Sequence, residues 1–245
     1  MEEYKSNKKR NLLGIIGGLG PMSSAYFYEL ITEHTAAACD QEHIDIILSS
    51  HATTPDRTDF ILGRSDDSPL PAMVSDAQSL EVYGASAIVI PCNTAHYFID
   101  EVRRSVSVPM PSIITETVLH CKKRGFRKAA VLATEGTILT SSYQREFEKY
   151  GMDWMIPDSS GTEKLMDIIY GKVKCGIIPD PAELYEIADP MFHAGCDCAI
   201  LGCTELSLIG KQMNDPRFVD SLVVLAACSI KLMGHKTTGL PSYFD

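Results

Sequence analysis

The chain has 245 residues, enough for one large or two small α/β domains, and its 45% hydrophobic and 22% charged residues are ordinary for a globular enzyme. The formal net charge of −10 argues against nucleic acid or an anionic membrane as the main partner, because both require a basic surface. No apolar stretch is long enough to span a bilayer, residues 1–11 lack the apolar core of a secretory signal, and the eight cysteines do not form a disulfide-scaffold pattern, so we expect reduced thiols and a cytoplasmic location.

Short β-branched runs alternate with longer amphipathic stretches along the chain. In the first part, strands are predicted at residues 11–17, 44–49, 85–91 and 110–113, and helices at residues 22–39, 69–83 and 93–105. In the second part, strands are predicted at residues 128–134, 152–156, 197–201 and 218–221, and helices at residues 141–150, 165–174, 181–193 and 222–233. Because strands separated by helices form βαβ units, we predict mostly parallel sheets.

Two of these strands end in the same way. Cys92 in IVIPCNTAH and Cys203 in AILGCTELS each follow an apolar run and precede polar residues suited to capping a helix. This near-duplication predicts an α/β fold of two pseudo-symmetric lobes, each a mostly parallel sheet flanked by helices, with the active site in the cleft between them. Residues 1–110 with 215–245 would form the N-terminal lobe, to which the last helix returns, and residues 111–214 the C-terminal lobe.

The two cysteines suggest the chemistry. Ligands of parallel α/β sheets bind at the carboxyl ends of strands, where Cys92 and Cys203 both lie. Two opposed thiols suit a cofactor-free racemase, in which one thiolate removes a Cα proton and the other thiol returns a proton to the opposite face. A helix N-terminus would stabilise each thiolate, although Glu205 adds a negative charge that would raise the pKa of Cys203. The alternative is that both cysteines only fill buried strand ends.

Short polar side chains accompany the cysteines at the predicted helix starts. Asn93, Thr94, Thr137 and Thr204, together with backbone N–H groups, would make a cradle for a carboxylate. The alternative is that they serve only as helix N-caps, which is their commonest role.

Two cations are candidates for holding a second carboxylate. Arg57, in the loop after the second strand, has the planar guanidinium that grips a carboxylate with two hydrogen bonds. Its alternative is a surface arginine paired with Asp56 or Asp59. Lys174, at the end of a predicted helix, would act similarly, or would only complement the helix dipole.

Three other site types fit the sequence less well. His96, four residues after Cys92, would suit a Cys–His hydrolase, but we expect it to pack or hydrogen-bond locally. The Gly18-x-Gly20 loop lacks the third glycine of a dinucleotide motif, where Ser23 stands. Cys196, Cys198 and Cys203 do not match known zinc-ligand spacings, so we expect no metal.

Several motifs, spread over nearly the whole chain, together resemble the aspartate/glutamate racemase family. They are IIGGLGPMSSAYFYELIT, DQEHIDIIL, PDRT, PCNTAH, LATEGTI and GCTEL. GGLGP, DQEH and PDRT resemble the aspartate racemase branch. The resemblance implies two lobes, no pyridoxal phosphate or other cofactor, no metal, and a homodimer. It also implies roles by position: Cys92 and Cys203 as the acid/base pair, Asn93, Thr94, Thr137 and Thr204 around the α-carboxylate and amino group, and Arg57 with Lys174 on the side-chain carboxylate.

The sequence therefore predicts an isomerase that interconverts L-aspartate and D-aspartate, with a small dicarboxylic amino acid as its partner and no role for nucleic acid or membrane. A glutamate or broad-specificity racemase stays open, because one methylene is a small difference to discriminate. Maleate isomerase, which acts on another dicarboxylate, also stays open. From other classes, a non-catalytic amino-acid-binding protein and a Cys–His hydrolase remain as alternatives.

Overall fold

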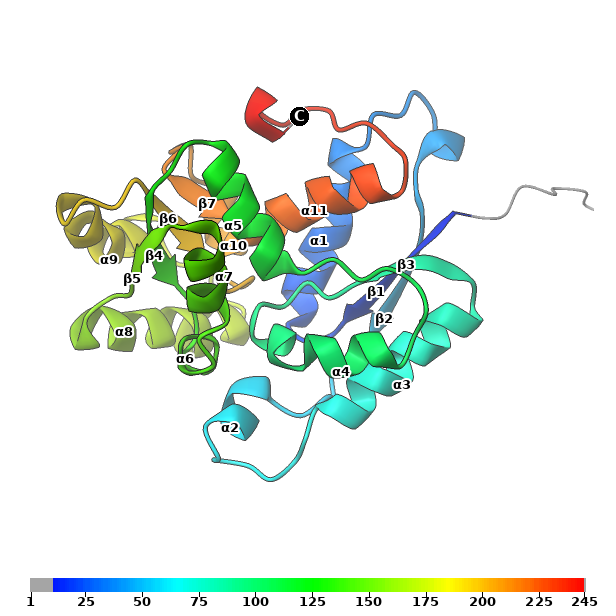
Figure 1. Cartoon of the computed structure of the whole chain (residues 1–245), viewed down its shortest axis with the longest axis horizontal. Coiled ribbons are helices and arrows are strands. Elements are labelled where there is room, and N and C mark those ends of the chain that lie inside the picture. Colours follow the sequence, from blue (N-terminus) through cyan, green and yellow to red (C-terminus); the bar gives the residue numbers. More distant parts are fainter. Residues whose placement is uncertain (1–10, 245) are drawn as a thin grey trace, which may run out of the picture.

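The computed structural model describes residues 11–244, in which two parallel β-sheets lie side by side with helices around and between them (Figure 1). The first sheet has the order β2-β1-β3, with β1 at Leu12–Gly17, β2 at Asp45–Ser50 and β3 at Ala85–Val89. The second has the order β5-β4-β6-β7, with β4 at Lys128–Leu132, β5 at Asp153–Met155, β6 at Cys198–Leu201 and β7 at Phe218–Asp220. The predicted α/β class is confirmed. Residues 1–10, which hold most of the predicted polar N-terminal tail, and residue 245 lie outside this description.

Three helices of the first half follow the predicted order, and a fourth, the short α2, begins at Arg57, in a segment that was predicted as a loop. They are α1 (Pro21–His34), α2 (Arg57–Ile61), α3 (Leu70–Val82) and α4 (Ile99–Arg104), with 3-10 turns η1 (Asp40–Glu42) and η2 (Thr94–Phe98). The segment after Cys92 therefore begins as a 3-10 turn and becomes α-helical only at Ile99. β1 is buried along its whole length, as expected for a central parallel strand covered on both faces.

The second half contains more helix than predicted. Its helices are α5 (Ile113–Lys123), α6 (Glu135–Leu139), α7 (Ser142–Tyr150), α8 (Ser159–Met166), α9 (Ala182–His193), α10 (Ser207–Gly210) and α11 (Ser221–Leu232). A π-helical turn, η3 (Asp167–Lys172), and 3-10 turns η4 (Val173–Cys175) and η5 (Ser242–Phe244) complete it.

The helix predicted at residues 22–39 ends earlier, at His34, and two other predicted elements differ more from the structure. The strand predicted at residues 110–113 is wrong: the β-branched run starts α5 instead, where the Ser112 hydroxyl accepts the N–H of Thr115 as an N-cap. The helix predicted at residues 165–174 begins earlier, at Ser159, with Asp158 as its cap, and changes to π-helical and 3-10 turns before Lys174. A π-helical turn places the following side chains off the regular helical face.

A shared core joins the two sheets. α1 and α11 lie side by side between them, and α11 also packs on α5 (Figure 1). One cluster of buried side chains accordingly runs from Ile15 and Phe27 through Leu225 to Val131 and Ile200. β7 belongs to the second sheet, so that sheet continues to Asp220, beyond the predicted boundary at residues 214 and 215. The lobe division itself stays a prediction.

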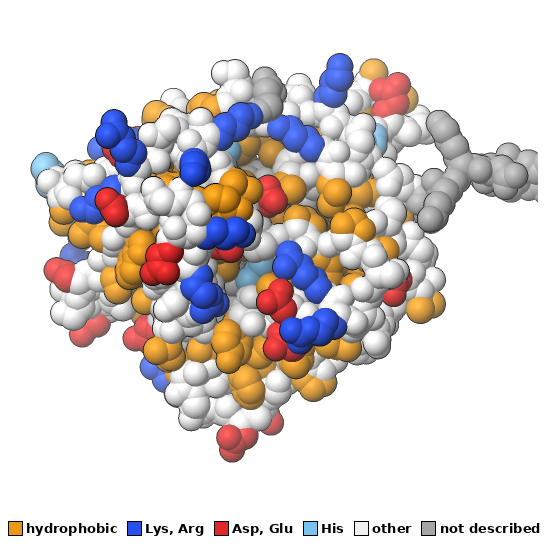
Figure 2. All heavy atoms as spheres, in the orientation of Figure 1, with side chains coloured by type: hydrophobic (Ala, Val, Ile, Leu, Met, Phe, Trp, Pro, Cys, Tyr) orange, Lys and Arg blue, Asp and Glu red, His pale blue; other side chains and the backbone are white. Residues whose placement is uncertain are grey.

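The surface carries charges of both signs. Lys and Arg side chains are interspersed with Asp and Glu across the face shown in Figure 2. On that face the net charge of −10 is not gathered into one acidic patch. Among residues 11–244, no helix combines the length and apolar character needed to cross a membrane.

Candidate active site

Cys92 and Cys203 line one small pocket, with a volume of about 10 Å³, at the carboxyl ends of β3 and β6. Both thiols are buried. The predicted residues Arg57, Asn93, Thr94, Lys174 and Thr204 line the same pocket, and Thr137 contacts it through Thr94. We call this space the thiol pocket. Its volume is about that of one water molecule, so an amino acid enters only if its walls move apart.

The two thiols have different backbone settings. Cys92 lies two residues before η2, next to its N-cap Asn93, so it stands close to the predicted helix start. Cys203 does not, because α10 begins only at Ser207, so the predicted helix N-terminus next to Cys203 is wrong. The Glu205 carboxylate lies there instead, and its Oε2 accepts the S–H of Cys203 at 3.0 Å.

The pKa of both thiols is raised, which contradicts the expected lowering by helix N-termini. Burial is the main cause in each case. For Cys92, the positive charge of Arg57 and the backbone N–H of Ala95 act in the opposite direction. For Cys203, the charge and the hydrogen bond of Glu205 raise the pKa further, as the sequence suggested. Cys203 is therefore the thiol more firmly held in its protonated form.

The raised pKa values of Cys92 and Cys203 predict how activity should depend on pH. The two-thiol racemisation predicted from the sequence needs one thiolate. Both thiol pKa values lie above their ordinary range, so kcat/KM for that reaction is expected to rise about tenfold per pH unit above neutrality. It should fall again where the second thiol ionises, because the proton donor is then lost. Initial rates with either enantiomer at pH values from about 6 to 10 test this. A flat profile around neutral pH would contradict it, since it would show that the thiolate is already formed.

The amide of Asn93 links the two lobes. Its Nδ2 donates to the Ser221 hydroxyl at 3.0 Å, and its Oδ1 accepts from the Tyr143 hydroxyl at 2.8 Å. Ser221 in turn donates to the carbonyl of Leu201, at the end of β6. The loop carrying Cys92 is thus fixed to the strand that leads to Cys203. A direct contact of Asn93 with substrate stays a prediction.

Three threonine hydroxyls from both lobes meet beside the thiols. Thr94 Oγ1 lies 2.9 Å from both Thr134 Oγ1 and Thr137 Oγ1, which are 3.1 Å apart. Thr134 caps α6; it starts a segment, residues 134–137, that was expected at the site from the sequence, but it had no assigned role there. Thr204 Oγ1 is buried and has no hydrogen-bond partner among the described residues. These hydroxyls offer donors to a carboxylate.

Arg57 is buried rather than on the surface, so its predicted alternative as a surface arginine is wrong. Its Nη2 donates to the carbonyl of Leu19 at 2.7 Å and its Nη1 to that of Pro55 at 3.1 Å. Its Nε is buried without a partner, and within residues 11–244 no carboxylate forms an ion pair with it. A buried cation paired only with carbonyl groups is unfavourable, so the site is arranged to receive an anion.

Lys174 faces Arg57 from the other lobe. Its Nζ lies 3.5 Å from Asp56 Oδ2 and 4.5 Å from the centre of the Tyr170 ring. Burial alone would raise the pKa of Asp56, but backbone N–H donors and the charges of Lys174 and Arg57 hold it below its usual value. An incoming carboxylate would therefore compete with Asp56 for the Lys174 ammonium group.

Both ring nitrogens of His96 are used locally, as predicted. Nδ1 lies 2.8 Å from the carbonyl oxygen of Cys92, and Nε2 accepts the N–H of Ile113 at 3.1 Å. Burial lowers the pKa of His96 to about 4. The ring therefore holds the Cys92 loop against the start of α5, and neither nitrogen is free to accept a proton from a thiol.

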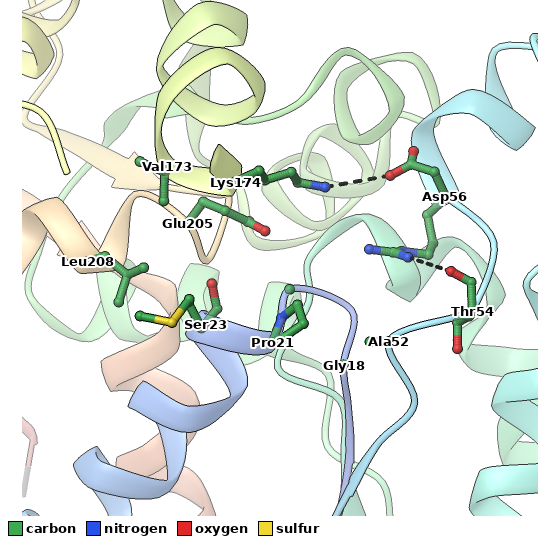
Figure 3. Close-up of a pocket in the computed structure, with 13 residues that line it drawn as sticks. Gly18, Pro21, Ser23, Ala52, Thr54, Asp56, Val173, Lys174, Glu205 and Leu208 are labelled. Atoms are coloured by element: carbon green, nitrogen blue, oxygen red, sulfur yellow. Dashed lines mark hydrogen bonds and ion pairs between the residues drawn. The ribbon is translucent and has the colours of Figure 1, made fainter. Parts of the chain in front are cut away.

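A larger pocket, which we call the outer pocket, is shown in Figure 3. It adjoins the thiol pocket. Its volume is about 330 Å³, and the two pockets share Asp56, Arg57, Lys174 and Glu205. Gly20 of the β1–α1 loop and the first turn of α1, with Pro21, Met22 and Ser23, line this pocket. Val173 and Leu208 line it as well (Figure 3). The outer pocket is large enough for an amino acid and leads to the two thiols.

This fold is that of solved racemases. An aspartate racemase from Picrophilus torridus superposes with a TM-score of 0.79 at 30% identity, over 93% of this chain and 96% of that one. An aspartate racemase homologue from Pyrococcus horikoshii superposes with a TM-score of 0.73 at 27% identity, over 92% of this chain and 99% of that one. In sequence, the broad-specificity amino-acid racemase RacX of Bacillus subtilis is 25% identical over 89% of this chain and 96% of its own length.

The family model for Asp/Glu/Hydantoin racemase matches residues 16–228. The chain belongs to this family, whose racemases are isomerases. The family predicted from PCNTAH, GCTEL and the other motifs is confirmed.

Proposed function

We propose that the protein racemises an acidic amino acid, converting L-aspartate to D-aspartate and back, with Cys92 and Cys203 as the acid/base pair and no cofactor. The observation that carries this proposal is the thiol pocket itself: two buried thiols from different lobes line one space, beside a buried Arg57 without an anionic partner.

The charges fit a substrate with two carboxylates. The hydroxyls of Thr94, Thr134 and Thr137, with that of Thr204, would donate to the α-carboxylate. Arg57 and Lys174 would hold the side-chain carboxylate, with Lys174 leaving Asp56. Donors fixed around the α-carboxylate stabilise the negative charge that moves onto it as the Cα proton leaves.

The proton transfers then follow from the two thiols. One thiolate takes the Cα proton and becomes a thiol, while the electron pair of the broken C–H bond is delocalised into the α-carboxylate. The opposite thiol gives its proton to the other face of Cα and becomes the thiolate. Each cysteine therefore acts as base for one enantiomer and as acid for the other. Closure of the pocket around the substrate would exclude water from these steps.

A second candidate is a racemase with broader specificity, acting on glutamate or on other amino acids. The outer pocket favours it, since about 330 Å³ next to the thiols leaves room for side chains longer than that of aspartate. Family members include the broad-specificity racemase RacX and a glutamate racemase of Persephonella marina, 30% identical over 54% of this chain and 51% of its own. The homodimer and the cytoplasmic location stay predictions.

Proton NMR in deuterated water tests the proposal. The reduced protein is incubated separately with L-aspartate, L-glutamate and maleate, and the amino acids are then resolved by chiral chromatography. Loss of the α-proton signal together with appearance of the D-isomer is the expected result, and the relative rates rank the substrates. Absence of exchange with both amino acids would overturn the proposal, and formation of fumarate from maleate would replace it with a maleate isomerase.

A further inference from the structure

Glu205 is a buried carboxylate that the proton transfers above do not use. It follows Thr204 in the loop after β6 and is 5% exposed. Its Oε2 accepts the S–H of Cys203, whereas its Oε1 is buried and has no hydrogen-bond partner among the described residues. Glu205 lines both the thiol pocket and the outer pocket, so the side chain stands where the two spaces meet. A buried carboxylate oxygen without a donor is costly unless a ligand supplies one.

The site contains many donors and few free acceptors. The threonine hydroxyls, Arg57 and Lys174 all suit carboxylates. The other acid that lines both pockets is Asp56, and both of its oxygens are occupied: Oδ1 accepts the N–H groups of Thr58 and Asp59, and Oδ2 faces Lys174. Glu205 Oε1 is therefore the carboxylate oxygen in the described pocket walls that still needs a donor.

Ser23 provides a second acceptor at the same place. Its hydroxyl is buried, also lacks a partner within the described chain, and is turned toward Glu205 across the pocket (Figure 3). Both groups adjoin Gly20: a Cβ there would stand 2.5 Å from Glu205 Oε1 and 3.4 Å from Ser23 Oγ. Gly20, with a positive φ of 144°, thus lets the two oxygens approach the loop closely.

We propose that Glu205, assisted by Ser23, binds the α-ammonium group of the substrate. The inference rests on the proposed function only in requiring an α-amino acid as substrate. An ammonium group has the donors and the positive charge that Glu205 Oε1 lacks, and charge-assisted hydrogen bonds are the stronger kind.

This placement links substrate binding to the state of Cys203. Without substrate, Glu205 accepts the S–H of Cys203 and its charge opposes ionisation of the thiol. An ammonium group bound at Oε1 would offset the negative charge of the carboxylate. Cys203 would then ionise more readily when an amino acid is present than when the site is empty.

The test compares an amino acid with its 2-hydroxy analogue. Isothermal titration calorimetry gives dissociation constants for L-aspartate and L-2-hydroxysuccinate, which differ in the ammonium group alone. The parent protein should prefer aspartate by about 10- to 100-fold, as a charged hydrogen bond implies. In Glu205→Gln this preference should fall to about one, because aspartate binds more weakly while 2-hydroxysuccinate binds equally well or more tightly. Ser23→Ala should reduce the preference by a smaller factor.

The matched control is Glu135→Gln, which neutralises a partly exposed acid on α6 that pairs with Arg64. It should leave the preference unchanged. If Glu205→Gln lowers turnover but retains the parent preference for aspartate, Glu205 only positions Cys203 and the inference is wrong. If the parent protein exchanges the α-proton yet shows no preference for aspartate, the inference fails while the proposed function stands. If the parent neither binds nor exchanges aspartate or glutamate, both fail.

Discussion

Cys92→Ala and Cys203→Ala should each lower the racemisation rate by about 10²- to 10⁴-fold, the contribution expected of one acid/base group. The physical reason is that inversion needs a proton donor and a proton acceptor on opposite faces of Cα. Each variant retains one thiol, so slow exchange of the α-hydrogen without inversion should persist for one enantiomer. The enantiomer that still exchanges its α-hydrogen should be L-aspartate in one variant and D-aspartate in the other. Proton NMR in deuterated water with pure L- and pure D-aspartate measures both quantities.

Cys39→Ala is the control, because Cys39 is exposed and lies outside both pockets. It should retain the parent rate. A Cys203→Ala variant that racemises as fast as the parent would show that a single base serves both faces. Retention of exchange for the same enantiomer in both variants would also contradict the two-sided arrangement.

Arg57→Gln should lower kcat/KM for aspartate by about 100-fold, since a buried charge-assisted hydrogen bond contributes about 1.5–3 kcal/mol. The loss should be confined to substrates with a side-chain carboxylate. The residual rate with asparagine, in which an amide replaces that carboxylate, should change by less than about threefold. Steady-state kinetics with the two substrates gives the comparison.

Arg64→Gln is the matched control, because Arg64 is an exposed arginine that pairs with Glu135 and Asp59. It should retain the parent kinetics with both substrates. Arg57 also donates to the carbonyl groups of Leu19 and Pro55, so its loss removes support from two loops. If Arg57→Gln lowers the rates with aspartate and asparagine equally, this support is its whole role and the side-chain carboxylate binds elsewhere.

The fold was largely predictable because buried parallel strands leave a strong signal. LLGIIG, ASAIV and KAAVL each became a strand close to its predicted bounds. The error at α5 has a local cause: the strand predicted at residues 110–113 ends in Ile113, which is β-branched and favours a strand, while the competing helix signals are single residues. Ser112 as the N-cap and Gly125, with its positive φ beyond the last turn, were those signals.

The residues of the candidate site were predictable where they follow strand ends, and were missed where their meeting depends on packing. Cys92, Cys203, Arg57 and Lys174 all follow recognisable segments, and the structure brings them together at one pocket. Thr134 reads as an ordinary helix cap, and nothing in the sequence shows that its hydroxyl meets Thr94 from the other lobe. Ser23 and Gly20 likewise become candidate site residues only because they lie next to Glu205, which is remote from them in sequence.

The two thiols have unequal surroundings, because Glu205 is hydrogen-bonded to Cys203 alone. This asymmetry can change how each enantiomer binds and reacts, but not the equilibrium ratio of the two enantiomers in solution. L- and D-aspartate have the same free energy in water, so their equilibrium constant is one and the two kcat/KM values of a racemase must be equal. The asymmetry can make one mirror image bind more tightly and turn over more slowly, but it cannot enrich either in solution. A cell that accumulates D-aspartate through this protein must therefore withdraw one enantiomer by a separate reaction.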